Sequence, residues 1–131
     1  MRVDFFDPER DVTAVVAMCA AEGWPSWSDP DLVARALSSP GSVALVALDG
    51  EETVGFAQIL TDGVISSYLA LLVTAASHRR SGIARELVAE GFARSGVGRM
   101  DLLTDDDAAA FYESMTHRPL RGYRLYAPDA H

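Results

Sequence analysis

The chain has 131 residues, of which 49% are apolar and 23% are charged, a balance typical of a packed globular protein that excludes disorder as an overall description. This length suits one domain, which we expect to span residues 1–131. The 19 acidic residues outnumber the 11 basic ones and give a formal net charge of -8, which argues against binding to a nucleic-acid backbone. All 11 basic residues are arginine, so mechanisms that need a lysine amine, such as a Schiff base or a P-loop lysine, are excluded.

Cysteine usage and the longest apolar segments bear on the compartment. Cys19 is the one cysteine of the sequence, so neither an internal disulfide nor a cysteine zinc site can form. The first residues, MRVDFFDPER, hold no apolar signal core, and the apolar run around residues 68–76 is much shorter than the roughly 20 residues of a membrane span. We therefore expect a cytoplasmic protein that does not associate with membranes.

The first part of the chain predicts a strand over residues 1–6 and then a helix that begins at Pro8. Its apolar residues recur at helical spacing: Val12, Val15, Val16 and Cys19. Cys19 is therefore expected to face the core rather than to act as a nucleophile. A loop that carries Trp24 and Trp27 follows, and then a short helix over residues 31–37.

The remaining elements predict a mixed, mostly antiparallel sheet. Apolar runs separated by Asp-Gly turns indicate an antiparallel meander of three strands, over residues 43–48, 53–60 and 64–73. The next elements are a helix over 81–95, a strand over 99–104, a helix over 106–115 and a last strand over 122–126. Because one crossover helix joins strands 64–73 and 99–104, these strands should be parallel neighbours in an α+β fold with helices on both faces.

The strand-to-helix turn at residues 77–84 carries the clearest chemical signal. Arg79, Gly82 and Ala84 have the spacing Arg-x-x-Gly-x-Ala, which puts small residues where backbone can approach a ligand closely. A helix N-terminus offers N–H groups without intrahelical partners and a dipole that favours an anion, so we predict a phosphate site. The alternative is that Gly82 only starts a helix. A dinucleotide fingerprint is disfavoured, because this turn follows an antiparallel meander.

With this turn, the chain resembles a GNAT N-acetyltransferase, the acetyl-coenzyme A-dependent class. The family's turn reads Arg/Gln-x-x-Gly-x-Gly/Ala, and the matching residues are Arg79, Arg80, Ser81, Gly82, Ile83 and Ala84. Downstream, residues 105–113 (DDDAAAFYE) resemble the family's Asn-x-x-Ala-x-x-Phe-Tyr-Glu helix. The resemblance covers residues 42–126 and implies a GNAT fold with acetyl-coenzyme A as cosubstrate and no metal.

The resemblance also implies roles for individual residues. The turn residues 79–84 would hold the cofactor's diphosphate on their backbone amides. The backbone groups offered to the pantetheine arm would be those of Leu72, Val73 and Thr74, and one of these N–H groups would polarise the thioester carbonyl. Tyr112 matches the tyrosine assigned to protonate the departing thiolate, and a phenol with a pKa of about 10 is protonated at neutral pH. Asp105 stands where the family has asparagine and is a further candidate for cofactor contact.

The sequence indicates less clearly which residues recognise the acceptor amine and which remove its proton. Some family members have a glutamate where this chain has Tyr68, and a neutral tyrosine is a poor base, so deprotonation through water is expected. The distant candidates for a base are Asp62, Glu113 and His117. Trp24, Trp27 and Tyr68 are candidate contacts of the acceptor, with the tryptophans as a cation–π wall. Equally, the two tryptophans could form a hydrophobic lid on the core.

The sequence therefore favours a cytoplasmic N-acetyltransferase in which a primary amine attacks acetyl-coenzyme A directly in a ternary complex. A catalytically inactive acetyl-coenzyme A-binding module and an acidic protein-interaction domain are the alternatives. Residues 78–99 hold five arginines and two glutamates, a net charge of +3, which leaves -11 for the rest of the chain and favours a cationic acceptor of open identity. A homodimer is also expected, since apolar last strands in small domains of this kind often pair between subunits.

Overall fold

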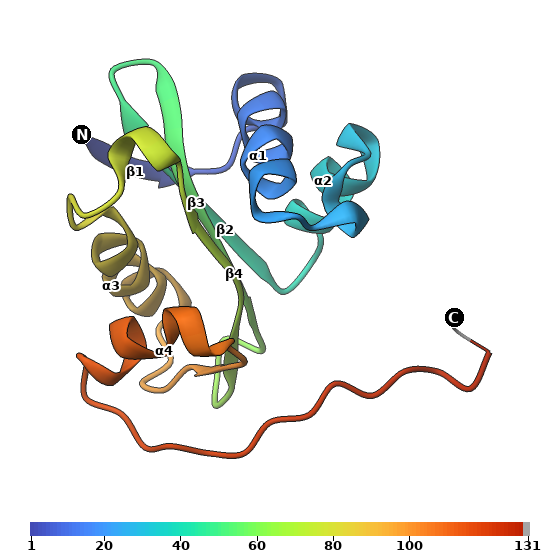
Figure 1. Ribbon diagram of the computed structural model, residues 1–131, viewed down its shortest axis with the longest axis vertical. Helices are drawn as coiled ribbons and strands as arrows, with labels where there is room; N and C mark the ends of the chain where they lie inside the picture. The colour runs from blue at the N-terminus through green and yellow to red at the C-terminus, as the bar shows by residue number, and fades with distance from the viewer. Residues whose placement is uncertain (130–131) are drawn as a thin grey trace. The chain divides into compact units, whose positions relative to one another are not determined.

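A single sheet organises the computed structural model, which describes residues 1–129 (Figure 1). Its strands have the order β1-β2-β3-β4-β5, with β1 at Arg2–Phe5, β2 at Ser42–Asp49, β3 at Glu52–Thr61, β4 at Ser67–Thr74 and β5 at Asp101–Leu102. The pairs β2–β3 and β3–β4 are antiparallel, as the predicted meander requires, and β1 also pairs with β2 in the antiparallel direction. The α+β class and the mixed sheet are thus confirmed.

The helices follow the predicted order, with α1 at Pro8–Glu22, α2 at Pro30–Leu37, α3 at Ile83–Ser95 and α4 at Asp106–Glu113. Two short 3-10 turns, η1 at Pro25–Trp27 and η2 at Ala76–His78, join them. Figure 1 shows α1 and α2 on one face of the sheet and α3 on the other. Because both faces are covered, β3 is buried from Thr53 to Ile59 without the alternation of a half-exposed strand.

The chain divides into two compact units, Met1–Asp101 and Leu102–His131. The first contains β1 to β4 and the helices α1, α2 and α3, and the second contains α4.

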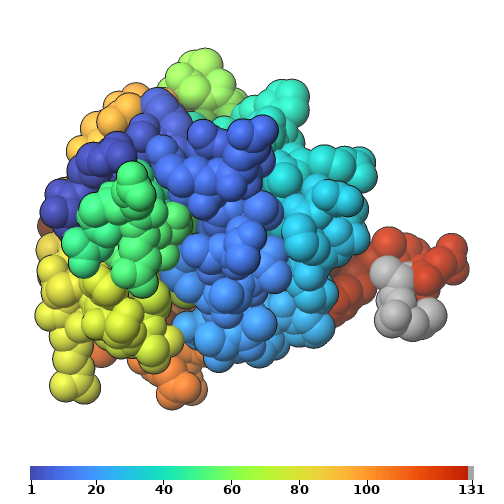
Figure 2. Space-filling view, turned by 90° about the horizontal axis from the view of Figure 1, so that it is seen from above, coloured from blue at the N-terminus to red at the C-terminus, as the bar shows by residue number. Residues whose placement is uncertain are grey.

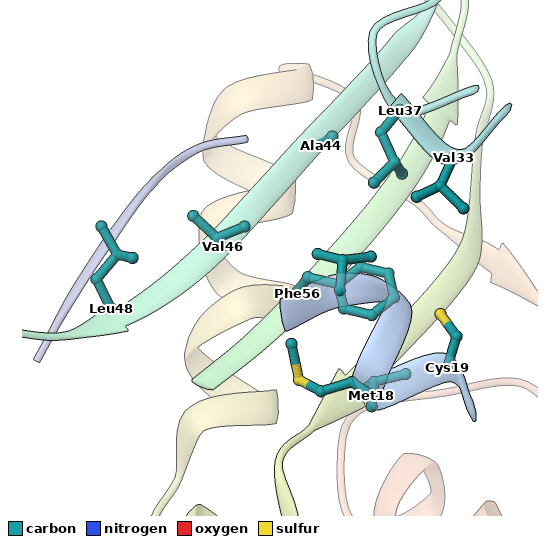
Figure 3. Packing of buried hydrophobic residues seen from close by; sticks show 10 residues of the cluster. Met18, Cys19, Val33, Leu37, Ala44, Val46, Leu48 and Phe56 are labelled. Carbon is teal, nitrogen blue, oxygen red and sulfur yellow. The ribbon is translucent and has the colours of Figure 1, made fainter. Parts of the chain in front are cut away.

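The core of the first unit lies between β2, β3 and the two N-terminal helices (Figure 3). Its buried side chains are Val15, Met18, Cys19, Val33, Leu37, Ala44, Val46, Leu48, Phe56 and Val73. Cys19 is fully buried, as its helical spacing predicted, and burial raises the pKa of its thiol to about 11. The thiol is therefore protonated at neutral pH and packs as a small apolar side chain.

Three predictions about strands are wrong: two strands are shorter than predicted, and one does not form. β4 begins at Ser67 and not at Val64, because Asp62 Oδ1 accepts hydrogen bonds from the N–H groups of Val64, Ile65 and Ser66 at 2.8, 2.8 and 3.0 Å. The Asp62 carboxylate thus caps a turn, and the three N–H groups that donate to it are not available for hydrogen bonds between strands. The strand predicted over residues 99–104 is reduced to the two residues of β5.

The third error is the last strand, predicted over residues 122–126, where the backbone forms neither strand nor helix. The apolar residues there read as a strand in the sequence, but a strand is stable only when its backbone groups and side chains have a neighbour. Leu125 is 90% exposed, so no neighbour covers it within the described part of the chain.

Asp11 forms a buried polar network that the sequence did not indicate. Its carboxylate is fully buried and accepts hydrogen bonds from Arg10 Nε at 2.8 Å, from Arg10 Nη2 at 3.0 Å, from the Thr53 hydroxyl at 2.7 Å and from the Asp7 N–H at 2.8 Å. Burial alone would raise the pKa of Asp11, but these hydrogen bonds outweigh it and lower the pKa. The network therefore fastens the first turn of α1 to β3.

Asp11→Asn should lower the free energy of unfolding at neutral pH by about 3 kcal/mol, because it removes the charge while leaving Arg10 and Thr53 in place. Since the pKa of Asp11 is held below its ordinary value of 3.8, its stabilisation is present at neutral pH and disappears as the pH falls through the lowered pKa. Urea unfolding at several pH values, with the exposed Glu51→Gln as control, measures this. If the difference in the free energy of unfolding between wild type and variant does not become smaller in acid, the stabilising role of the Asp11 charge is contradicted.

Candidate active site

The turn between β4 and α3 leaves the start of α3 open to an anion. Gly82, at the N-cap, has φ 84° and ψ 5°, and Arg80 has φ 64°, so both occupy the left-handed region. Because the N-cap residue is glycine, no side chain makes a capping hydrogen bond at this helix start. A Cβ built on Gly82 would meet no atom within 4 Å. The first N–H groups of α3 therefore face a space without a capping side chain, which is the geometry that favours binding of a phosphate.

Polar contacts hold this turn to neighbouring elements. His78 Nε2 lies 2.9 Å from Asp49 Oδ2 at the end of β2, and His78 Nδ1 lies 2.7 Å from Ser77 Oγ. The Ser81 hydroxyl donates to the His78 carbonyl and is not available as a cap. Figure 2 shows the loop before α3 (yellow) beside the β2–β3 turn (green) and α1 (blue). Asp49, remote in sequence, carried no signal that would have identified it as a partner.

Arg79 connects three parts of the first unit. Its Nε donates to the Thr74 carbonyl at the end of β4 at 3.4 Å, and its Nη2 donates to Glu22 Oε1 at the end of α1 at 2.9 Å. The Arg79 side chain is 55% exposed, so the ion pair is partly open to solvent. Arg79 thus both supplies positive charge and orients the turn, and Glu22 is a partner that sequence analysis missed.

β4 carries an irregularity just before the residues predicted to face the pantetheine arm. Its register with β3 pairs Leu71 with Gln58 and Leu69 with Ile59, so Ala70 has no partner. Such a bulge changes the direction in which the following backbone groups point. Beyond it, Leu72 and Thr74 are half-buried and Val73 is buried, so the strand ends directly before the turn.

The second edge of β4 is covered only in part. The Ser67 hydroxyl donates to the Arg99 carbonyl, which places residue 99 beside the start of β4. Two residues of β5 cannot extend along all eight of β4, since both strands advance about 3.3 Å per residue. The backbone of Leu72, Val73 and Thr74 therefore lies beyond the reach of β5.

The candidate acceptor residues do not form a common cluster. Trp24 and Trp27 are partly buried and pack against the core between α1 and α2, which supports the lid interpretation of this pair. Tyr68 is half-buried in β4, opposite Leu60 of β3. Asp62 accepts the backbone hydrogen bonds of its own turn, from Val64, Ile65 and Ser66. These hydrogen bonds lower the pKa of Asp62, which makes it a weak base.

In the second unit, Asp105 caps α4 and influences Tyr112. Its Oδ1 accepts a hydrogen bond from the Ala108 N–H at 3.2 Å, a role in which aspartate replaces asparagine well. Burial, and then the negative charge of Asp105, raise the pKa of Tyr112 above 10.0. The Tyr112 ring packs edge-on against Phe111, with centroids 5.0 Å apart. Tyr112 is therefore a protonated phenol throughout the neutral range.

The other distant candidates lie on the exposed surface of the same unit. Glu113 ends α4, and His117 Nδ1 lies 2.8 Å from the Met115 carbonyl. Within residues 1–129, no group of three or more His, Cys, Asp or Glu side chains is arranged to hold a metal ion. In the same part of the chain, no helix is long and apolar enough to cross a membrane.

Comparison with solved structures shows the same fold in other proteins. A GNAT-family acetyltransferase from Streptococcus pneumoniae TIGR4 has a TM-score of 0.75 at 23% identity, over 98% of this chain and 97% of that chain. A transcriptional regulator from Bacillus halodurans C-125 also has a TM-score of 0.75, at 21% identity, over 96% of this chain and 99% of that chain. An aminoglycoside 6'-N-acetyltransferase complexed with coenzyme A has a TM-score of 0.65 at 23% identity, over 78% and 61% of the two chains.

Sequence comparison agrees with the fold. Among curated proteins, none matches this sequence. A family model described as an acetyltransferase (GNAT) domain matches residues 40–115, which extend from the start of β2 through α4 and include both the turn before α3 and Tyr112. Since this match covers more than half of the sequence, the chain belongs to the GNAT acetyltransferase family.

Proposed function

We propose that this protein is a cytoplasmic N-acetyltransferase that transfers the acetyl group of acetyl-coenzyme A to a primary amine in a ternary complex. The observation that carries the proposal is the N-terminus of α3, where Gly82 is the N-cap residue and no side chain makes a capping hydrogen bond. A thioester supplies an activated acyl group with a good leaving group. The turn fits a diphosphate, because its left-handed Gly82 leaves open space and Arg79 and Arg80 lie beside it.

The chain's own residues would act at two points of the reaction. The acceptor nitrogen forms a bond to the acetyl carbon and the carbon–sulfur bond breaks, while negative charge develops on the carbonyl oxygen. A backbone N–H among Leu72, Val73 and Thr74 would stabilise that charge. The Tyr112 phenol would donate its proton to the departing thiolate. One proton of the acceptor ammonium would leave through water before the attack, and the second nitrogen proton, lost as the amide forms, would restore the phenol.

The acceptor is proposed to be cationic before it loses its proton. Outside residues 78–99 the chain has a net charge of -11, and such a field draws cations toward the protein. The weak basicity of Asp62 favours one alternative, a module that binds acetyl-coenzyme A without catalysis. Catalysis and binding are therefore tested separately.

Release of free thiol from acetyl-coenzyme A, measured against a panel of aminoglycosides, polyamines, amino acids and peptides, tests the enzymatic proposal. At least one amine should raise the rate of thiol release at least about tenfold over hydrolysis, with a matching acetylated product seen by mass spectrometry. Binding of coenzyme A with no turnover of any amine would instead support the binding module.

Gly82→Ala should weaken coenzyme A binding about tenfold or more, because a Cβ disfavours the left-handed backbone that opens the start of α3. Gly63→Ala is a matched control: Gly63 also has a left-handed backbone, with φ 72°, and open space, but it lies in the turn before β4. Isothermal titration calorimetry gives both dissociation constants. Equal effects of the two substitutions would place the diphosphate elsewhere.

Tyr112→Phe should lower kcat by about 10²-fold or more while the dissociation constant of acetyl-coenzyme A stays within about twofold, because only the donated proton is removed. Since burial and Asp105 raise the pKa of Tyr112, any decline of the wild-type rate from loss of this proton should begin at a higher pH than for an ordinary tyrosine. Tyr126→Phe, in an exposed position, is the control. A Tyr112→Phe variant with wild-type turnover would remove this residue from the mechanism.

A further inference from the structure

The C-terminal end of α1 carries negative charge that the helix itself does not neutralise. Glu22 is the last residue of α1, and the last turn of this helix holds no basic residue. Because the C-terminal end of a helix dipole is negative, a carboxylate there is unfavourable and a cation is favoured. The cation present is the guanidinium of Arg79, whose Nη2 donates to Glu22 Oε1 at 2.9 Å. The end of α1 is therefore a cation site that a distant segment of the chain fills.

Arg79 is held weakly at this site. The side chains of Arg79 and Glu22 are 55% and 33% exposed, and an ion pair this open to solvent contributes little to stability. The second hydrogen bond of Arg79, from Nε to the Thr74 carbonyl, is 3.4 Å long, which exceeds the usual range for an N–H donor. A diphosphate at the start of α3 would offer this guanidinium a more highly charged partner close by. Arg79 can therefore exchange Glu22 for the diphosphate at little cost.

Glu22 also adjoins the loop that carries Trp24 and Trp27. The chain turns at Gly23, and the Trp24 N–H donates to the Cys19 carbonyl at 3.1 Å, which fastens the start of this loop to the end of α1. Glu22 shares a face of α1 with the buried Cys19, since residues at this spacing are neighbours on a helix. It therefore borders the core against which both tryptophans pack. A carboxylate close to indole rings suits an ammonium group, which aromatic faces also attract.

We propose, on the basis of the proposed function, that Glu22 binds a second cationic group of the acceptor once the diphosphate of acetyl-coenzyme A has drawn Arg79 away from it. The acceptor is then a diamine or a longer polyamine. One of its amines loses a proton and is acetylated, while another stays protonated on Glu22, as an alkyl ammonium with a pKa of about 10 does at neutral pH. The cofactor thereby raises the affinity for the acceptor, and by linkage the acceptor raises the affinity for the cofactor.

The first test measures steady-state acetylation of linear alkyl diamines of increasing length, each against the monoamine of the same length. For wild type, kcat/KM should be at least about tenfold higher for the best diamine than for its monoamine, and Glu22→Gln should reduce this ratio to within about twofold by raising the KM of the diamine. The same variant should bind coenzyme A about threefold more tightly, because Glu22 no longer competes for Arg79. Opposite effects on the two ligands are not expected from structural damage.

The second test does not depend on catalysis. Isothermal titration calorimetry of diaminobutane into cofactor-free protein should show weak binding to wild type, where Arg79 occupies Glu22. Arg79→Gln should bind diaminobutane at least about tenfold more tightly, and the double variant with Glu22→Gln should lose this gain. Glu90→Gln is the matched control in both tests, since it removes an equal charge from an ion pair with Arg94 in which the side chains are 36% and 38% exposed. Circular dichroism and thermal melting confirm that each variant is folded.

The outcomes separate this inference from the proposed function. Turnover of amines with equal kcat/KM for diamine and monoamine would leave acetyl transfer in place and remove Glu22 as a binding residue of the acceptor. If Arg79→Gln binds diaminobutane no more tightly than wild type, the end of α1 is not a cation site. Weaker binding of coenzyme A to Glu22→Gln would show that Glu22 supports Arg79 and does not compete for it. A cation site found by calorimetry without turnover of any amine would overturn the proposed function, and the acceptor role of Glu22 with it.

Discussion

The close approach of α3 to β3 at Gly55 fixes the position on which the proposed phosphate site depends. A Cβ at Gly55 would lie 2.9 Å from Ile83 Cγ2 and 3.2 Å from the Val73 carbonyl oxygen, so any other residue there would force neighbouring atoms to shift. Ile83 is the first residue of α3, which places the uncapped helix start beside the last residues of β4. Gly91 repeats this contact farther along α3, against Ile59. The position of the uncapped start of α3 is therefore a consequence of helix–sheet packing.

Polar contacts then orient the turn on this rigid support. His78 joins it to Asp49, and Arg79 joins it to Thr74 and Glu22, so β2, β4 and α1 each hold one part of it. Exposed ion pairs contribute little to the free energy of unfolding, about 0–1 kcal/mol each. Their effect here is to restrict the conformations of a loop whose backbone must face a ligand, which is how rigid scaffolds present functional loops.

The sequence predicted what depends on local patterns and missed what depends on neighbours. Helical spacing around Cys19 and the turn before α3 were readable because they involve residues close together in the chain. The burial of Asp11 could not be predicted, because its partner Thr53 is far away in sequence and aspartate is usually exposed. Asp62 shortened β4 through three backbone hydrogen bonds that no apolar pattern contains. The assignments of Tyr112 and of residues 72–74 remain predictions.

The wrong prediction of a strand over residues 122–126 and the exposure of the side chains there have one physical origin. Alternating apolar residues predict a strand only on the assumption that another strand or surface covers them, and the described chain supplies none for Leu125. Arg121 and Arg124 also make burial of this segment against an apolar core costly, because each charge would need a partner.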